Sequence, residues 1–460
     1  MLVRSLRAVA ATAILSSVFC APACAQGLTL AQAVQYALVH SPTVAKQQAS
    51  VDQLHAAYLR TRANALPAVT GSLQNQMQKS QNYSGAYSII GTSQASVFSQ
   101  NTASIGTNYT FNGGLAQIQT QVARQQFEQA QTQLTQTQHQ IASEVANAYF
   151  TYAGKLESVG LDNGDLAYQN ALLSVAKAKE RAGVAAGVDV LSANAQVEKS
   201  HYTLAAAQAD AENSREALAQ TIGAPLTSQF EVPAAIAQPQ LPRQPLAALI
   251  ALAQQNRPEV RSALQGVEIA RTNRRTADTD LFPQIQTFAS FGNQFSPTLA
   301  VEEQRSVPPG ITIPRGTPGY WNLGVISSVS FPFWDWGSRR ANHANLDAQI
   351  ASANADLQAQ QAQVELDVRQ AYRAAQTALA QLASAQDESR YAKEASRVAR
   401  LQYQNGIITL IDVQQRQQAS LAAQADLYNA RVAYATAIVK LRAATGIYTP
   451  QQDVADFEGR

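Results

Sequence analysis

Five histidines are the residues of this chain with the broadest chemistry, because imidazole binds metals and transfers protons near neutral pH. They are His40, His55, His139, His201 and His343. Their separations match no metal-ligand spacing, and the chain has neither a phosphate-binding glycine loop nor a Gly-x-Ser-x-Gly turn. Asp278 and Asp280 form one Asp-x-Asp, which is typical of a solvated helix face. The sequence therefore predicts no enzyme, no cofactor and no metal site.

Glycine and aspartate recur instead at a fixed separation. Gly114, Tyr149, Gly183, Asp189 and Gly223 return 223 positions later as Gly337, Tyr372, Gly406, Asp412 and Gly446. Pro42 and Pro67 return 216 positions later as Pro258 and Pro283. A fixed period indicates a duplicated structural unit, here of about 220 residues and hence of several elements.

The N-terminus predicts export from the cytoplasm. Arg4 and Arg7 precede a short apolar run over 8–19, and Ala23-Cys24-Ala25 fits a small-x-small cleavage pattern. We interpret residues 1–25 as a signal peptide. The alternative, an uncleaved anchor, is disfavoured because the run is well short of ~20 residues. Both cysteines lie in this segment, so disulfide and thiol chemistry are not expected in the mature chain.

Composition narrows the class of protein. Lys plus Arg number 34 and Asp plus Glu number 32, so no basic field for nucleic acid is expected. After residue 26 no stretch of ~18 apolar residues predicts a membrane-spanning helix. An exported chain with this pattern is either soluble or a β-barrel protein.

Both repeats predict the same order of helices. Each opens with a short amphipathic helix and a longer one that starts at a proline and ends before the next proline; these cover 30–39, 42–66, 246–255 and 258–282. Two proline-free segments of 69 residues follow, at 114–182 and 337–405. Each would form a helix of about 100 Å. Return helices of 33 residues are predicted at 190–222 and 413–445, so each repeat makes a helical hairpin.

One stretch conflicts with the first long helix. Gly154, Gly160 and Gly164 lie inside it, and each interior glycine costs about 1 kcal/mol relative to alanine. The run from Asp162 to Asp165 also suits a turn or a calcium loop. We favour a weakened helix, because the matching stretch of the second repeat has no helix breaker.

Between the helices, apolar and small polar residues alternate with period two, which predicts strands with differently solvated faces. The predicted strands cover about 67–78, 103–112, 283–292 and 320–333. On this pattern Leu73, Tyr109, Ile285 and Val325 face lipid, while Gln74, Asn108, Gln286 and Gly324 face a lumen. Aromatic residues near the strand ends suit a membrane girdle; they are Tyr109, Phe111, Trp321, Phe331, Trp334 and Trp336. Ordinary hairpins on a soluble core are the alternative.

Four strands cannot close a barrel, and open edges in lipid would leave backbone groups unpaired. The chain is therefore expected to oligomerise, with each copy contributing part of one barrel. We predict a mainly α fold that joins this membrane β-barrel to a tube of long helices, which is a conduit across a cell envelope.

The duplicated order and its motifs resemble the TolC-like outer-membrane efflux proteins. The motifs after the strands are Asn112-Gly113-Gly114 and Trp334-Asp335-Trp336-Gly337; at the turns they are Arg181 to Val184 with Asp189-Val190-Leu191, and Asn405-Gly406-Ile407 with Asp412-Val413. The resemblance covers about 28–450. It divides the chain into a first repeat at 26–230, a Pro-rich linker at 231–245, a second repeat at 246–450 and a tail at 451–460.

The resemblance implies a homotrimer in the outer membrane, with a twelve-stranded barrel and a periplasmic helical tunnel. It also implies a periplasmic adaptor (a membrane fusion protein) and an inner-membrane pump as partners. The adaptor would dock on the hairpin tips, at Gly183-Val184 and Gly406-Ile407. The tunnel gate would lie at Asp189, Tyr403 and Asp412, although a further acidic position of such gates is Gln415 here. The alternative role for both aspartates is to cap helices that begin at Val190 and Val413.

Two other classes of function stay open on the sequence. A structural or adhesive envelope-spanning coiled coil would need an apolar core on every helix, which the Gln-, Ser- and Asn-rich faces disfavour. A passive diffusion porin would not need helices of 69 residues. The sequence identifies neither the cargo nor the class of pump.

Overall fold

The computed structural model describes residues 28–83, 93–233, 240–296, 317–330 and 333–446. The predicted signal peptide, the C-terminal tail, the middle of the Pro-rich linker and the centres of both strand–strand loops lie outside these residues, as does Phe331. Within the described residues, none of the helices combines the length and hydropathy needed to cross a bilayer.

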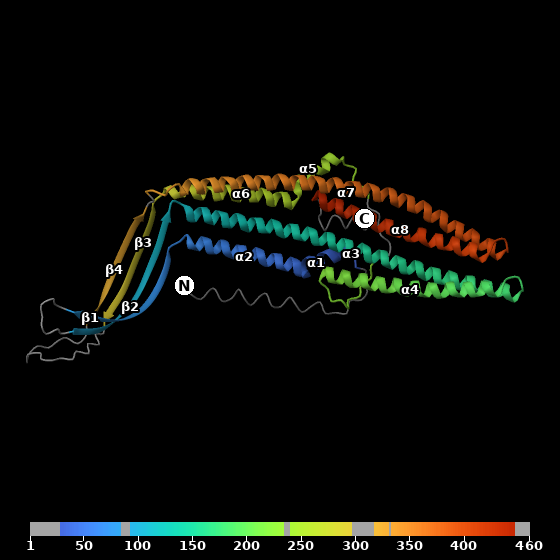
Figure 1. The fold of residues 1–460 in the computed structure, drawn as a ribbon, viewed down its shortest axis with the longest axis horizontal. Coiled ribbons are helices and arrows are strands. Elements are labelled where there is room, and N and C mark those ends of the chain that lie inside the picture. The colour runs from blue at the N-terminus through green and yellow to red at the C-terminus, as the bar shows by residue number, and fades with distance from the viewer. Residues whose placement is uncertain (1–27, 84–92, 234–239, 297–316, 331–332, 447–460) are drawn as a thin grey trace, which may run out of the picture. The chain divides into compact units, whose positions relative to one another are not determined.

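Both repeats have the same order of elements (Figure 1). The first contains α1 Leu30–His40, α2 Pro42–Asn64, β1 Ala68–Tyr83, β2 Ser93–Asn112, α3 Leu115–Arg181 and α4 Gly187–Ile222. The second contains α5 Leu246–Asn256, α6 Pro258–Asp278, the 3-10 turn η1 Thr279–Leu281, β3 Gln284–Ser296, β4 Thr317–Ser330, α7 Ser338–Gln404 and α8 Leu410–Thr445. Helices α3 and α7 each have 67 residues, and α4 and α8 each have 36.

The chain divides into two compact units. The sheet unit comprises the described residues of 50–131 and 262–358, and the hairpin unit comprises those of 1–49, 132–261 and 359–460. In the hairpin unit α4 packs beside α3, and α8 packs beside α7 (Figure 1). We call α3–α4 the first hairpin and α7–α8 the second hairpin.

The sheet unit holds one antiparallel sheet with strand order β1-β2-β3-β4. Up to the register shift between Gln294 and Ser296 of β3, odd-numbered residues lie opposite odd-numbered ones, so each face of the sheet there carries a single parity. β1, β2 and β3 extend beyond their predicted ends, and Phe333 lies in a bend beyond the end of β4. Cross-strand hydrogen bonds extend the first three strands into segments rich in Gln, Ser and Asn. Hydrophobic alternation is absent there, so the sequence does not predict these parts of the strands.

At two glycines, the ends of the return helices approach the breaks between the short helices closely. Gly223 after α4 and Gly446 after α8 adopt φ values of 77° and 70°, which favour glycine. A Cβ at Gly223 would lie 2.7 Å from the carbonyl oxygen of His40, where α1 ends. A Cβ at Gly446 would lie 3.1 Å from the backbone nitrogen of Arg257, where α5 gives way to α6. The duplicated glycines therefore allow the same close backbone approach in both repeats.

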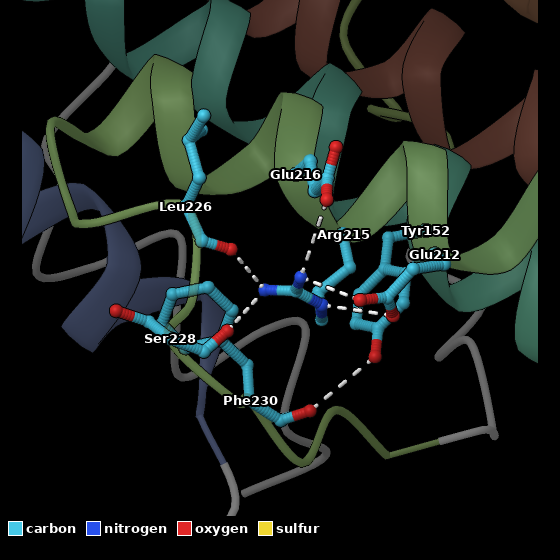
Figure 2. Close-up of polar contacts among 7 residues, drawn as sticks. All are labelled: Tyr152, Glu212, Arg215, Glu216, Leu226, Ser228 and Phe230. Atoms are coloured by element: carbon cyan, nitrogen blue, oxygen red, sulfur yellow. Dashed lines mark hydrogen bonds and ion pairs between the residues drawn. The ribbon is translucent and has the colours of Figure 1, made fainter.

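A buried arginine holds the segment that leaves α4. The guanidinium of Arg215 donates to the carbonyl oxygens of Leu226, at 2.7 Å, and Ser228, and it pairs with the Glu212 carboxylate at 2.6 Å (Figure 2). Nearby, the Tyr152 hydroxyl donates to the carbonyl oxygen of Phe230 at 3.4 Å. These bonds satisfy backbone groups of a segment without secondary structure.

Helix α3 runs without interruption through the glycines predicted to weaken it, so the preference for a helix over a turn or calcium loop is confirmed. Gly154 has a packing role, since a Cβ there would lie 2.6 Å from a methyl carbon of Val432 on α8. Gly160 and Gly164 have no such neighbour within 4 Å.

Candidate functional site

Each hairpin reverses direction at a glycine. Gly183 and Gly406 adopt φ values of 73° and 78°, and their amides donate to the carbonyl oxygens of Glu180 and Tyr403. The next amides, of Val184 and Ile407, donate back five residues, at 3.0 Å and 2.9 Å. This is the Schellman arrangement, which satisfies the last carbonyl groups of a helix and requires the left-handed geometry that glycine tolerates.

The predicted docking residues are exposed at these turns. Val184 is 73% exposed and Ile407 is 68% exposed. A second exposed apolar pair, Val188 and Ile411, lies in the first turn of the return helices and was not predicted from the sequence. The signal was present, because Val188 and Ile411 are 223 positions apart, like Val184 and Ile407. We call these four residues the tip patches.

The two turn aspartates do not cap helices as the sequence suggested. Both return helices begin three residues earlier than predicted, at Gly187 and Leu410. Asp412 is therefore the third helical residue, and its carboxylate accepts from the Thr409 amide at 3.1 Å and hydroxyl at 2.6 Å. The Asp412 amide donates back to the Thr409 hydroxyl at 3.3 Å, which completes a capping box.

The first hairpin lacks this box. Ala186 occupies the position that Thr409 has in the second hairpin, and it makes no side-chain cap. Asp189 is half-buried at the third helical position, and no capping hydroxyl engages its carboxylate. The duplicated aspartates thus have different surroundings, a difference that only the residues before them indicate.

The structure brings Asp189 and Tyr403 together and leaves Asp412 apart. Tyr403 is only 4% exposed, and within the described chain its hydroxyl has no hydrogen-bond partner. Burial, together with the nearby charge of Asp189, raises the pKa of Tyr403. Asp412 is exposed, and its hydrogen bonds from Thr409 hold the pKa of its carboxyl below its usual range.

A third residue, which the sequence did not predict, completes this contact. Lys179 of α3 places its ammonium group 4.0 Å from the centre of the Tyr403 ring and donates to the carbonyl oxygen of Tyr403. Its counterpart in the second repeat is Gln402, so duplication gave no signal. Ser192 and Gln414 make a further contact between the hairpins, with a 3.4 Å hydrogen bond, while Gln415 is exposed.

The sheet separates its side chains by face, as the alternation predicted. Leu73, Tyr109, Ile285 and Val325 share the odd face; Gln74, Asn108, Gln286 and Gly324 share the even face. The odd face exposes large apolar side chains, including Leu73, Ile105, Phe291 and Leu323. Phe288 and Ile326, which lie opposite one another, depart from the polar character of the even face.

Aromatic side chains gather where β4 gives way to α7. Phe333, Trp334 and Trp336 are exposed, and the two indole rings meet edge to face at 5.8 Å. Trp336 has a φ of 52°, a strained value for a bulky residue, where the first repeat has Gly113. The Asp335 carboxylate fixes this turn by accepting from the amides of Gly337 at 3.2 Å and Arg339 at 3.0 Å.

Metal-ligating side chains are scattered over the described residues. Among them, no group of three or more His, Cys, Asp or Glu side chains is placed to hold a metal ion. The features that stand out are an apolar sheet face, two exposed tip patches and a Lys179–Tyr403–Asp189 contact between hairpins.

Comparison with known proteins agrees with this geometry. The family model described as "outer membrane efflux protein" matches residues 33–224 and 249–447, one match in each repeat. Curated relatives from Pseudomonas putida, an antibiotic efflux pump outer membrane protein ArpC and a toluene efflux pump outer membrane protein TtgC, are 23% identical over 424 residues. Each alignment covers 91% of this chain and 82% of the relative.

Solved structures share the fold. The Campylobacter jejuni CmeC outer membrane channel superposes with a TM-score of 0.72 at 17% identity, covering 92% of this chain and 88% of that one. The open state of the Neisseria gonorrhoeae MtrE outer membrane channel also gives 0.72, at 21% identity, covering 91% and 89%. The predicted fold class, long helices joined to a sheet of outer-membrane channel type, is therefore confirmed.

Proposed function

This chain belongs to the outer membrane efflux protein family, whose members are channels rather than enzymes, and on that basis we propose a specific assembly. Three copies form one duct. The duct receives substrates from the periplasm or from an inner-membrane pump and releases them outside the cell.

The observation that carries the proposal is the sheet. β1 and β4 are its outer strands, and each pairs with only one strand among the described residues. One face is apolar and exposed, so the sheet suits lipid on that side. Because unpaired edges in lipid cost several kcal/mol per backbone group, β4 of one copy pairs with β1 of the next. Three four-stranded sheets then close a twelve-stranded barrel in the outer membrane.

The hairpins supply the periplasmic part of the duct. Three copies contribute six hairpins, which associate as a tunnel that continues from the barrel. A passive porin would have no use for two 67-residue helices. A solid adhesive coiled coil is disfavoured because it would need an apolar core on every helix, whereas these helix faces are rich in Gln, Ser and Asn.

The tip patches are the docking site for a periplasmic adaptor. Val184 with Val188, and Ile407 with Ile411, expose apolar side chains at the ends of both hairpins. Apolar residues exposed next to a backbone reversal suit a protein partner better than water. The adaptor then connects the duct to an inner-membrane pump.

The gate lies just behind these patches. Lys179 and Asp189 belong to the first hairpin and Tyr403 belongs to the second, so their contact holds the tips of one subunit together. Asp412 acts mainly as part of a helix cap, with any role in the gate secondary to the Tyr403 contact.

Complementation tests the proposal. The gene is expressed in a strain that lacks its own outer-membrane duct, together with the matching pump and adaptor, and susceptibility to pump substrates is measured. We expect restored efflux. If the protein assembles in the outer membrane and restores no efflux, but admits small solutes without a pump, the result would favour a passive porin instead.

A further inference from the structure

A buried polar layer divides the packing of the four long helices into two parts. One apolar cluster includes Val145, Leu218 and Ile438, and the other includes Leu172 and Val413. Along each helix the residues of the first cluster are separated from those of the second by buried polar side chains. The polar layer, as we call it, consists of Asp165, Gln169, Ser200, Ser396 and Gln417.

Asp165 lies at the centre of the layer. One oxygen of its carboxylate accepts from the Ser200 hydroxyl of α4 at 2.7 Å. The other accepts from the Gln417 amide of α8 at 2.9 Å and from the Gln169 amide of α3 at 3.1 Å. Ser396 of α7 donates to the Gln417 carbonyl oxygen at 2.7 Å, so the network reaches all four helices.

This carboxylate is buried and has no ion-pair partner in the described chain, although Lys393, Arg397 and Arg400 line the pocket beside it. Asp165 is 6% exposed, and in the described part of the chain no lysine, arginine or histidine nitrogen lies within 4.0 Å of it. Replacing a buried charged group with well-packed apolar residues is often neutral or stabilising.

Space beside the layer lets water reach it. A pocket of about 450 Å³ is lined by Asp165, Ser396 and Gln417 and opens over Gly160 and Gly164. A side chain at either glycine would meet nothing within 4 Å, so these glycines keep the pocket open rather than allow close packing. A polar cavity of this size has room for several waters.

The duplication does not reproduce the layer at the matching positions. The residue that matches Asp165 in the second repeat is Glu388, which is exposed. The residue that matches Ser200 is a buried alanine. In the first repeat, Leu173 matches Ser396 and is part of the second apolar cluster. Asp165, Ser200 and Ser396 therefore have no equivalents at the matching positions of the other repeat. The repeated fold itself does not require them.

We propose that Asp165 is a positioning residue for transport: it holds the second hairpin against the first, and the polar layer is the level at which the hairpins part when the duct opens. This inference rests on the proposed function. Separating two apolar surfaces exposes them to water at a cost that grows with area. Separating a polar layer exchanges protein hydrogen bonds for bonds to water, which changes the free energy little. Beyond the layer, the contacts of the second apolar cluster that join the hairpins separate as well, while the contacts within each hairpin stay intact.

Asp165→Asn tests the holding role. Asparagine keeps the shape but cannot accept from all three donors, so one donor stays buried without an acceptor in the closed state and bonds to water only when the hairpins part. That penalty corresponds to about a tenfold change in an equilibrium constant. We expect conductance in planar bilayers without a pump to rise about tenfold while trimer level and melting temperature stay near wild type. Asp210→Asn, which removes an exposed carboxylate paired with Lys155, is the matched control and should conduct like wild type.

A second variant tests the parting of the hairpins. Replacing Asp165, Gln169 and Gln417 by leucine, with Ser200→Ala and Ser396→Ala, makes the layer apolar and removes its donors together with their acceptors. We expect a trimer at least as heat-stable as wild type, no added conductance, and about tenfold weaker efflux because the hairpins no longer separate.

Unchanged conductance in Asp165→Asn, or full efflux with the apolar layer, would overturn this inference. If the apolar variant does not assemble, the asparagine variant decides alone. Failure of the wild-type chain to restore efflux would instead refute the proposed function. The two failures are therefore distinguishable.

Discussion

The ammonium group of Lys179 lies 4.0 Å from the centre of the Tyr403 ring and donates to the backbone carbonyl of the same tyrosine. One side chain of the first hairpin thereby holds both the ring and the backbone of the second hairpin. The Tyr403 hydroxyl, by contrast, has no hydrogen-bond partner within the described chain. The contact depends on the ring and on Lys179, and the hydroxyl adds nothing to it.

Tyr403→Phe should therefore leave the tips closed. Removing a buried hydroxyl without a partner is expected to be neutral or to stabilise the chain by about 1 kcal/mol. Lys179→Met removes a cation–π contact and a hydrogen bond, and we expect about tenfold higher leak conductance. Single-channel recording of both variants checks this. A leaky phenylalanine variant would mean that the hydroxyl has a partner in the assembled duct.

Charge on the tip patches should block partner docking without preventing assembly. Val184 and Ile407 are exposed, so glutamate at either position buries nothing within the chain. We expect Val184→Glu and Ile407→Glu to abolish efflux in a strain lacking its own duct, while trimer levels match wild type. Gln418→Glu, at another exposed position of α8, is the control. Full efflux by Ile407→Glu would show that the adaptor docks elsewhere.

The Asp412 cap predicts a pH dependence confined to one hairpin. Hydrogen bonds from Thr409 lower the pKa of Asp412, so the ionised carboxylate stabilises the start of α8. This stabilisation is complete above the ordinary aspartate pKa of about 3.9 and is lost as the pH falls through the lower folded value. The protection factors against hydrogen exchange at the start of α8, which correct for the intrinsic rate at each pH, should fall in acid.

The start of α4 is the internal control, because Ala186 gives it no side-chain cap and its exchange should lack this transition. Asp412→Ala should raise exchange at α8 at neutral pH, and any rise in leak conductance should be smaller than for Lys179→Met. Equal leak in the two variants would place Asp412 in the gate itself.

The two sheet faces should differ in their tolerance of charge. Leu73 lies on the apolar odd face and its neighbour Gln74 on the even face. Lysine on a lipid-facing strand position near the middle of the membrane costs about 2–4 kcal/mol, and a lumen position costs much less. We expect Leu73→Lys to reduce assembled trimer strongly and Gln74→Lys to reduce it little. Equal losses would mean that the odd face does not contact lipid.

Much of the fold was predictable because its signals are local. Prolines mark the starts of α2 and α6, and glycines mark the ends of α4 and α8. Strand ends were missed where pairing, rather than alternation, extends a strand. The starts of α4 and α8 were missed because the aspartates were read as caps, whereas the actual cap positions are Ala186 and Thr409.

The candidate site was predictable only in part, for a different reason. Gly183, Val184, Gly406 and Ile407 lie at turns that the sequence marks directly. Lys179 and Asp165 act through partners more than 200 residues away, Tyr403 and Gln417 respectively. Neither has a like residue in the other repeat that makes the same contact, so duplication could not indicate them. Such roles emerge only when the two hairpins are packed together.

The number of chains in the purified assembly tests the central claim most directly. The native mass of the detergent-solubilised protein, measured without crosslinking, should equal three mature chains, because only neighbouring copies can pair β1 and β4. A stable folded monomer, or an assembly of any number other than three, would contradict the proposed duct.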